Sequence, residues 1–278
     1  MSDPYDLDAG PDPAALAAST PESGSPPAEN PVYAVGIGPG DPEYLTPRAE
    51  RAIREADVVV GFTTVVEFVE DLTDADLLTC GYKDEAEALE AFGERVAAGE
   101  SGTAVAMGDP NHSGYQFVGK VQDAVEQAST SPDSQARQDA VESEDPEIPV
   151  RVIPGISAIQ MAASRARTPM EDTEFVTLHK SGDLEADMER LVAAVTDDER
   201  HLLTLPRPYD RMPGDIAATV LEAGADPDLE ALVLEKLTHD EEEIHRFTLG
   251  GLSEHAGGNG KDDTPFSDLV VLAVRQPV

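Results

Sequence analysis

The chain has 278 residues, 40% of them hydrophobic, which is enough apolar material for two ordinary domains or one large one. Acidic residues number 56 against 19 basic ones, and the formal net charge of -37 opposes nucleic-acid phosphates and anionic membranes. We therefore expect neither nucleic acid nor a membrane as a partner.

The acidic excess is spread along the whole chain, with only five lysines. It resembles proteins of salt-loving cells, whose concentrated counterions shorten the range of self-repulsion. We expect a halophilic source, and a generic acidic protein or an acidic tail stays open as the alternative.

Cysteine content and hydropathy indicate a cytoplasmic location. The single cysteine, Cys80, cannot form an internal disulfide, and no Cys/His spacing suggests a zinc site. No segment approaches the roughly 18 consecutive apolar residues of a membrane span. The N-terminal sequence MSDPYDLDAG is acidic, whereas a signal peptide begins with basic residues.

Residues 1–30 are rich in Pro, Ala, Ser and Asp, contain no Lys or Arg, and show no apolar period. Such a segment cannot offset the entropy of ordering, so we predict a disordered tail. Residues 129–147 have the same character and are predicted to form a disordered surface insertion.

Between these two segments, β-branched runs alternate with helical patterns. Strands are expected at 32–37, 57–60, 103–107 and 150–153, and helices at 47–56, 85–98, 114–127 and 157–167. This alternation predicts βαβ units with a mainly parallel sheet, and we assign residues 31–169 to a first α/β domain.

A second alternation follows Thr168-Pro169. Strands are expected at 174–179, 201–205 and 229–237, with helices at 184–195 and 209–223. Two further strands, 243–249 and 269–275, have no long helix between them. Residues 170–278 are therefore predicted to form an α/β domain with antiparallel strands added at one side.

The first predicted strand runs into the loop GIGPGDP, residues 36–42. The loop lacks the Gly-Lys-Ser/Thr of a phosphate-binding P-loop, and its glycine spacing and prolines do not fit the dinucleotide fingerprint. By itself it could be an ordinary turn. However, GDP (108–110) and PGISA (154–158) follow two more strands of the same half. Because parallel strands end at one sheet edge, the three loops predict a ligand site there.

These motifs, in order from GIGPGDPEYLT (36–46) through GDP to PGISA, resemble those of the tetrapyrrole methylases. The resemblance covers about residues 32 to 274. It implies the two-domain α/β fold of class III methyltransferases, with a mainly parallel N-terminal sheet and a mixed C-terminal sheet. It also implies S-adenosylmethionine as cofactor and a homodimer.

Within the family, PGISAIQMAASR (154–165) and FVTLHKSG (175–182) most resemble the enzymes that methylate cobalt-precorrin-7 at carbon 5 in cobalamin synthesis. Asn111-His112-Ser113 and His179-Lys180-Ser181 depart from the family pattern. The alternatives are methylation at another precorrin carbon, diphthine synthase activity, and a non-catalytic nucleotide-sensing module.

The resemblance implies cofactor contacts at Pro39, Met107, Gly108, Asp109, Ser157, Ala158 and Leu205. An anionic tetrapyrrole needs cationic partners, and substrate contacts are expected at His179, Lys180 and Arg165. Further candidate cations for the substrate site are Lys83, Arg167, Arg207, Arg211 and Lys236.

Asp109 has three possible roles: general base, metal ligand, or cap of the backbone amides in its Gly-Asp-Pro turn. Neither a general base nor any other catalytic residue is assigned. His112, His239 and His245 form no ligand spacing, so the cobalt is expected to arrive already held by the macrocycle, and no protein metal site is predicted.

Overall fold

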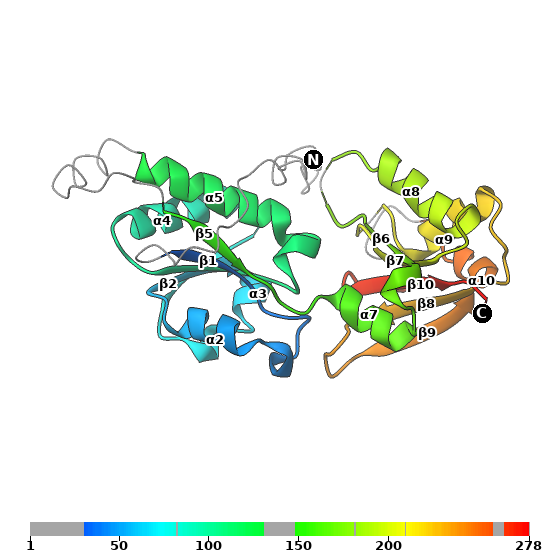
Figure 1. Cartoon of the computed structure of the whole chain (residues 1–278), viewed down its shortest axis with the longest axis horizontal. Helices are drawn as coiled ribbons and strands as arrows, with labels where there is room; N and C mark the ends of the chain where they lie inside the picture. The colour runs from blue at the N-terminus through cyan, green and yellow to red at the C-terminus, as the bar shows by residue number, and fades with distance from the viewer. Residues whose placement is uncertain are drawn as a thin grey trace. The chain divides into compact units, whose positions relative to one another are not determined.

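The computed structural model describes residues 31–81, 83–130, 148–180, 182–208, 210–257 and 264–277 (Figure 1). The chain divides into two compact units between Ile156 and Ser157. This division falls before the boundary expected after residue 169, because helix α7 (Ala158–Ala166) packs on β7 (His201–Leu205) and β10 (Val270–Arg275) of the second unit.

The predicted tail, residues 1–30, lies outside the described residues. So does the predicted insertion after residue 130. Its first residue, Ser129, is instead the buried last residue of helix α5 (Tyr115–Ser129).

The first unit contains a parallel sheet with strand order β3-β2-β4-β1-β5, as predicted from the strand–helix alternation. The strands are β1 (Val32–Gly36), β2 (Val58–Phe62), β3 (Asp76–Cys80), β4 (Gly102–Ala106) and β5 (Val150–Ile153). Strand β3, at one edge of the sheet, was not predicted.

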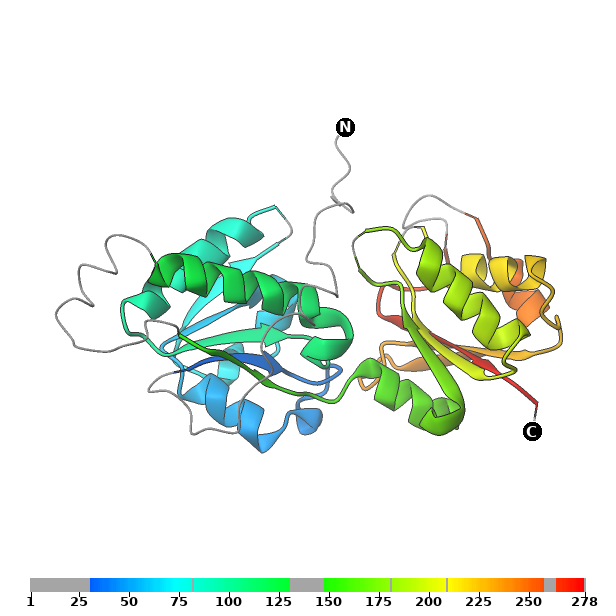
Figure 2. The ribbon, with the colours of Figure 1, turned by 45° about the horizontal axis from the view of Figure 1, so that its top comes forward.

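Helices cover both faces of this sheet (Figures 1 and 2). Helices α4 (Glu85–Ala97) and α5 pack together over one face, while α2 (Pro47–Arg54) and α3 (Thr63–Val66) cover the other. Alternate residues of β2 serve the two sides, since Val58 and Val60 belong to the first core and Val59 to the second. This two-sided burial explains the continuous apolar strands.

The helix after the first loop begins where the sequence predicts. The Thr46 hydroxyl accepts a hydrogen bond from Ala49 N at 3.2 Å, and Pro47 occupies the first helical position. This cap fixes Thr46 as the residue at which the loop after β1 ends and α2 begins.

The second unit contains a mixed sheet, as predicted, in the order β6-β7-β10-β8-β9. The antiparallel strand β10 lies in the middle of this sheet, between β7 and β8, and not at one side as expected. Its other strands are β6 (Thr173–Thr177), β8 (Glu230–Glu235) and β9 (Glu243–Thr248). Strands β6 and β7 are parallel, whereas β10 is antiparallel to both β7 and β8, and β9 is antiparallel to β8.

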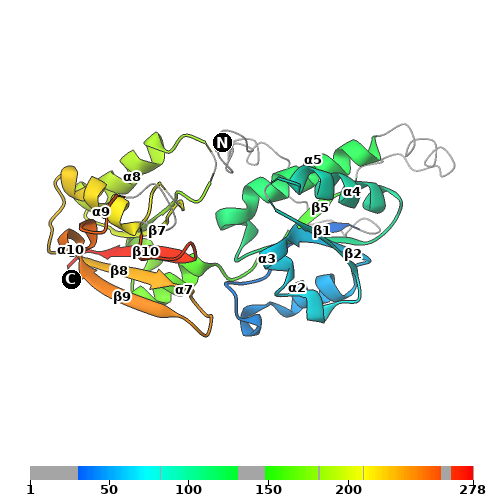
Figure 3. The same ribbon diagram turned by 180° about the vertical axis from the view of Figure 1, so that it is seen from behind.

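One core of this unit lies between its sheet and three helices (Figure 3). The helices are α8 (Glu185–Thr196), α9 (Pro213–Glu222) and α10 (Leu249–Ser253). They bury Leu191, Ile216 and Leu252 against strand residues such as Val233 and Leu272. Helix α7 packs on β7 and β10 from the opposite face.

No helix within the described ranges is long and apolar enough to cross a membrane. Cys80 is a buried free thiol whose pKa is raised to about 11, chiefly by burial and then by the negative charge of Glu85. A thiol in this state is a poor nucleophile and metal ligand.

Candidate active site

The loops after β1, β4 and β5 meet at the carboxyl-end edge of the first sheet, because β1 lies between the other two strands. Gly108 N donates to the Gly38 carbonyl at 2.7 Å, and Gly38 N donates to the Gly108 carbonyl at 3.3 Å. A Cβ atom on Gly36 would lie 2.6 Å from Gly155 N. All three predicted loops are therefore in direct contact.

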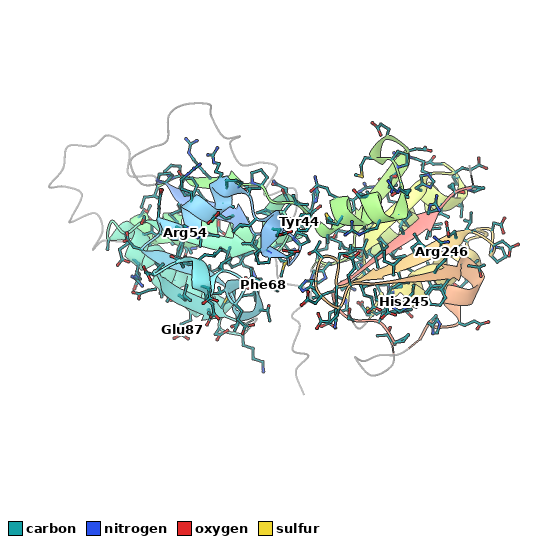
Figure 4. The ribbon with its side chains drawn as sticks, turned by 90° about the horizontal axis from the view of Figure 1, so that it is seen from below. Tyr44, Arg54, Phe68, Glu87, His245 and Arg246 are labelled. Atoms are coloured by element: carbon teal, nitrogen blue, oxygen red, sulfur yellow. The ribbon has the colours of Figure 1, made fainter. Side chains whose placement is uncertain are left out.

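Two glycines of this junction have backbones that side chains disfavour. Gly38 has φ 89° and Gly108 has φ 67°, both in the left-handed region. Pro39 is buried beside them, and Met107 packs partly buried against the core under α2. Tyr44, labelled in Figure 4, ends the short 3-10 helix Pro42–Tyr44, and its carbonyl oxygen would lie 3.2 Å from a Cβ on Gly38.

Asp109 is 8% exposed, and its Oδ1 accepts a hydrogen bond from Asn111 N at 2.8 Å. That bond caps a single π-helical turn, Pro110–Gly114, which leads into α5. Of the three possible roles, this geometry supports capping. Within the described residues, no group of three or more His, Cys, Asp or Glu side chains is placed to hold a metal ion.

Ser157 and Ala158 begin the second unit at the start of α7. The Ser157 hydroxyl accepts from Gln160 N at 3.2 Å, and Gln160 Oε1 accepts from Ser157 N at 2.9 Å. This reciprocal capping box satisfies two orphan amides of the helix. The Ser157 hydroxyl thus has a structural role in shaping the PGISA loop.

In the second unit, β6, β7 and β8 all end at one edge, because β7 and β8 are both antiparallel to β10. Leu178 N donates to the Leu205 carbonyl at 2.8 Å, so the segments after β6 and β7 lie side by side. The structure therefore brings Leu205 to the same edge as His179 and Lys180.

Four of the predicted cations follow these strands: Lys180, Arg207, Arg211 and Lys236. Lys180 Nζ lies 2.8 Å from Asp187 Oδ2, with the lysine side chain 15% exposed. Arg207 Nε donates to Asp210 Oδ1 at 2.8 Å. Lys83 lies in the first unit, and Arg167 is the C-cap residue that follows α7.

His179 is half-buried and donates a hydrogen bond to the Pro206 carbonyl. Burial lowers the pKa of His179, opposed by that hydrogen bond and by the negative charge of Asp268. The imidazole is therefore neutral at pH 7 and can serve a ligand as a dipolar hydrogen-bonding group, not as a cation.

Arg165 projects from α7 and is not a free cation. Its Nε donates to Glu242 Oε1 at 2.8 Å, and its Nη2 donates to Glu242 Oε2 at 3.4 Å. Glu242 could not be predicted from the sequence, because no motif links two residues 77 positions apart.

The profile of the tetrapyrrole (corrin/porphyrin) methylases matches residues 31–128 and 133–253, and the chain belongs to this family. It is an S-adenosylmethionine-dependent methyltransferase. The predicted enzyme class and cofactor are confirmed.

Among its relatives is the probable cobalt-precorrin-7 C(5)-methyltransferase of Methanocaldococcus jannaschii. The two are 28% identical over 228 residues, which cover 82% of this chain and 92% of the relative. The cobalt-factor III methyltransferase of Priestia megaterium is 30% identical over 146 residues, covering 52% of this chain and 24% of that protein.

Solved structures confirm the fold. The methyltransferase CobJ superposes with a TM-score of 0.64 at 21% identity, covering 89% of this chain and 94% of CobJ. The uroporphyrin-III C-methyltransferase of Thermus thermophilus, complexed with S-adenosylhomocysteine, gives 0.56 at 22% identity, covering 88% and 92%.

Proposed function

We propose that this methyltransferase acts on a cobalt-precorrin in cobalamin biosynthesis, and specifically on cobalt-precorrin-7 at carbon 5. The observation that carries this proposal is the relative from Methanocaldococcus jannaschii, which is matched over 92% of its length. The sequence of the α7 region and of the segment after β6 supports the same assignment.

The residues at the two strand edges suit the cofactor. In the first unit, Pro39, Met107, Gly108 and Asp109 would hold it, mainly through backbone groups that a glycine-rich loop leaves accessible. In the second unit, Ser157, Ala158 and Leu205 would do so. The bound cofactor supplies an electrophilic methyl group and leaves as a neutral thioether.

Such a displacement asks little acid–base chemistry of the protein. The chain must align the attacking carbon with the methyl group, and alignment alone can supply effective molarities of order 10⁵ M or more. The capped turns at Asp109 and Ser157 serve this purpose, because their side chains fix the loops in one conformation.

A polycarboxylate substrate would be repelled by a chain of net charge -37 unless cations gather locally. The carboxyl-end edge of the second sheet offers such a place, with Lys180, Arg207, Arg211 and Lys236 following its strands. Substrate carboxylates would there compete with Asp187 for Lys180 and with Asp210 for Arg207. Lys180 would bind one substrate carboxylate, and His179, whose single N–H goes to the Pro206 carbonyl, would accept a hydrogen bond from a donor group of the substrate.

The substrate is tested by kinetics on a panel. Purified protein is assayed for kcat/KM with cobalt-precorrin-7, other cobalt-precorrins, uroporphyrinogen III and a diphthamide-carrying translation factor. We expect cobalt-precorrin-7 to give the highest value. A higher kcat/KM with another precorrin would show that a different macrocycle carbon is methylated. Modification of the translation factor alone would refute the proposal.

Two further parts of the proposal concern the state of the protein. We propose that it forms a homodimer in a halophilic cytoplasm, with neither nucleic acid nor membrane as a partner. Light scattering in molar KCl tests the dimer.

A further inference from the structure

The connection between β8 and β9, residues 236–242, has a backbone that its residues disfavour. Lys236 has φ 47° and Thr238 has φ 73°, and neither is glycine. The left-handed region is a genuine outlier for a β-branched residue such as threonine. Conformations of this kind persist only where surrounding contacts enforce them, and they gather at functional sites.

Glu242 supplies those contacts from both of its carboxylate oxygens. Oε2 accepts a hydrogen bond from Thr238 N at 2.7 Å, and Oε1 accepts from Arg165 Nε at 2.8 Å. The pKa of Glu242 is lowered, first by its hydrogen bond to Arg165 and further by the one from Thr238, against the opposing effect of burial. The carboxylate thus stays charged and joins the strained turn to helix α7.

The connection lies where it can affect a ligand. Strand β8 ends at the same edge as β6 and β7, which carry Lys180 and Arg207 after them, with β10 lying between β7 and β8. Lys236 N donates to the Leu269 carbonyl at 2.8 Å and fixes the first end of the connection, while Glu242 N donates to the His239 carbonyl at 3.0 Å within it.

We propose that Arg165 and Glu242 form a clamp that holds residues 236–242 in the shape required for substrate binding. The inference rests on the proposed function, because it concerns the site for that substrate. Arg165 is then a positioning residue: it acts through Glu242 and the connection, and it does not bind a substrate carboxylate itself.

Direct binding and clamping predict opposite effects of Glu242→Gln. If Arg165 bound the substrate, removing the competing carboxylate would free its guanidinium and lower KM. If Arg165 clamps the connection, the same change releases residues 236–242 and raises KM. The amide has nearly the shape of the carboxylate, so the variant tests charge without leaving a cavity.

The experiment compares Arg165→Ala, Arg165→Lys, Glu242→Gln and the double variant Arg165→Ala/Glu242→Gln. It measures KM and kcat for cobalt-precorrin-7, the Kd for S-adenosylmethionine, and amide exchange of residues 236–242. Arg190→Ala is the matched control, because Arg190 pairs with Glu174 near the opposite end of β6.

We expect Arg165→Ala and Glu242→Gln each to raise KM about threefold to tenfold and to accelerate exchange of the connection, as loss of a charged hydrogen bond implies. The double variant should be no worse than either single one, Arg165→Lys should recover part of the loss, and kcat and cofactor affinity should change little. Arg190→Ala should leave all these values unchanged.

A lower KM for Glu242→Gln, or additive effects in the double variant, would overturn the clamp. So would unchanged exchange in residues 236–242. If the unmodified protein methylates no cobalt-precorrin, the proposed function fails separately, and exchange alone decides whether the clamp exists.

Discussion

Gly36 and Gly108 approach each other so closely that a Cβ atom on Gly36 would lie 2.5 Å from the Gly108 carbonyl oxygen. Real Cβ atoms essentially never come so near to backbone. The same atom would lie 2.6 Å from Gly155 N. Three loops can therefore share one sheet edge only because the positions where they touch carry no side chain.

Gly36→Ala should lower the free energy of unfolding by about 1–3 kcal/mol, as forced overpacking does. It should also weaken S-adenosylmethionine binding, because the loops must separate. Denaturant unfolding and calorimetry measure the two effects. Gly81→Ala is the control, since its Cβ would meet only Asp84 Oδ1 at an ordinary 3.5 Å. Equal cofactor affinity in both variants would show that the contact between the three loops is not needed for cofactor binding.

Asp109→Asn should retain kcat within a few fold, because an asparagine side chain can still cap Asn111 N. Asp109→Ala should lose about 1 kcal/mol of stability, the typical value of a lost cap. Steady-state kinetics and thermal unfolding check both. A fall in kcat of about a hundredfold or more for Asp109→Asn would instead indicate a general base.

His201 should make stability depend on pH below neutrality. It is buried and its Nδ1 accepts a hydrogen bond from Gln276 N at 3.0 Å, which requires the neutral imidazole. Burial lowers the pKa of His201, opposed by Asp172 and assisted by Arg275. The folded state then binds fewer protons than the unfolded state as the pH falls through the ordinary histidine value of about 6.5.

Stability from His201 is thus present above that pH and is lost below it. His201→Gln should flatten this part of the pH profile. Urea unfolding at constant molar KCl between pH 7.5 and about 5 measures the slope, where the full effect is set by 1.36 kcal/mol per unit of pKa shift. An unchanged slope would show that His201 is not the titrating group.

Salt should strongly affect both fold and activity. At 0.01 M ionic strength the Debye length is about 30 Å, so the charge of -37 repels itself and an anionic substrate over long distances. In molar KCl it falls to about 3 Å. We expect melting temperature and kcat/KM to rise steeply with KCl. Equal values at 0.05 M and 2 M would refute the halophilic prediction.

Most of the fold follows from the sequence because its central strands are buried on both faces. Val58, Val59 and Val60 have no exposed area, and such a β-branched run reads clearly as a strand. Strand β3 could not be predicted in this way, since it begins with the exposed Asp76 and only its last residue, Cys80, is buried. Its pairing with β2, not its composition, makes it a strand.

The candidate site likewise has parts that could be predicted from the sequence and parts that could not. The three glycine loops could be predicted, because Gly and Pro after successive strands mark one sheet edge. The pairing of Arg165 with Glu242 could not, since it depends on how α7 packs near the β8–β9 connection. Sequence identifies Arg165 as a cation but gives no sign of its partner.

The central claim is methyl transfer to cobalt-precorrin-7, and isotope-labelled NMR of the product tests it most directly. Protein in molar KCl is incubated with cobalt-precorrin-7 and S-adenosylmethionine carrying a ¹³C methyl group. We predict one new labelled methyl group, bonded to carbon 5 of the macrocycle. A label at another carbon would contradict the assigned position, and an unlabelled macrocycle from folded protein that binds the cofactor would contradict the proposed function itself.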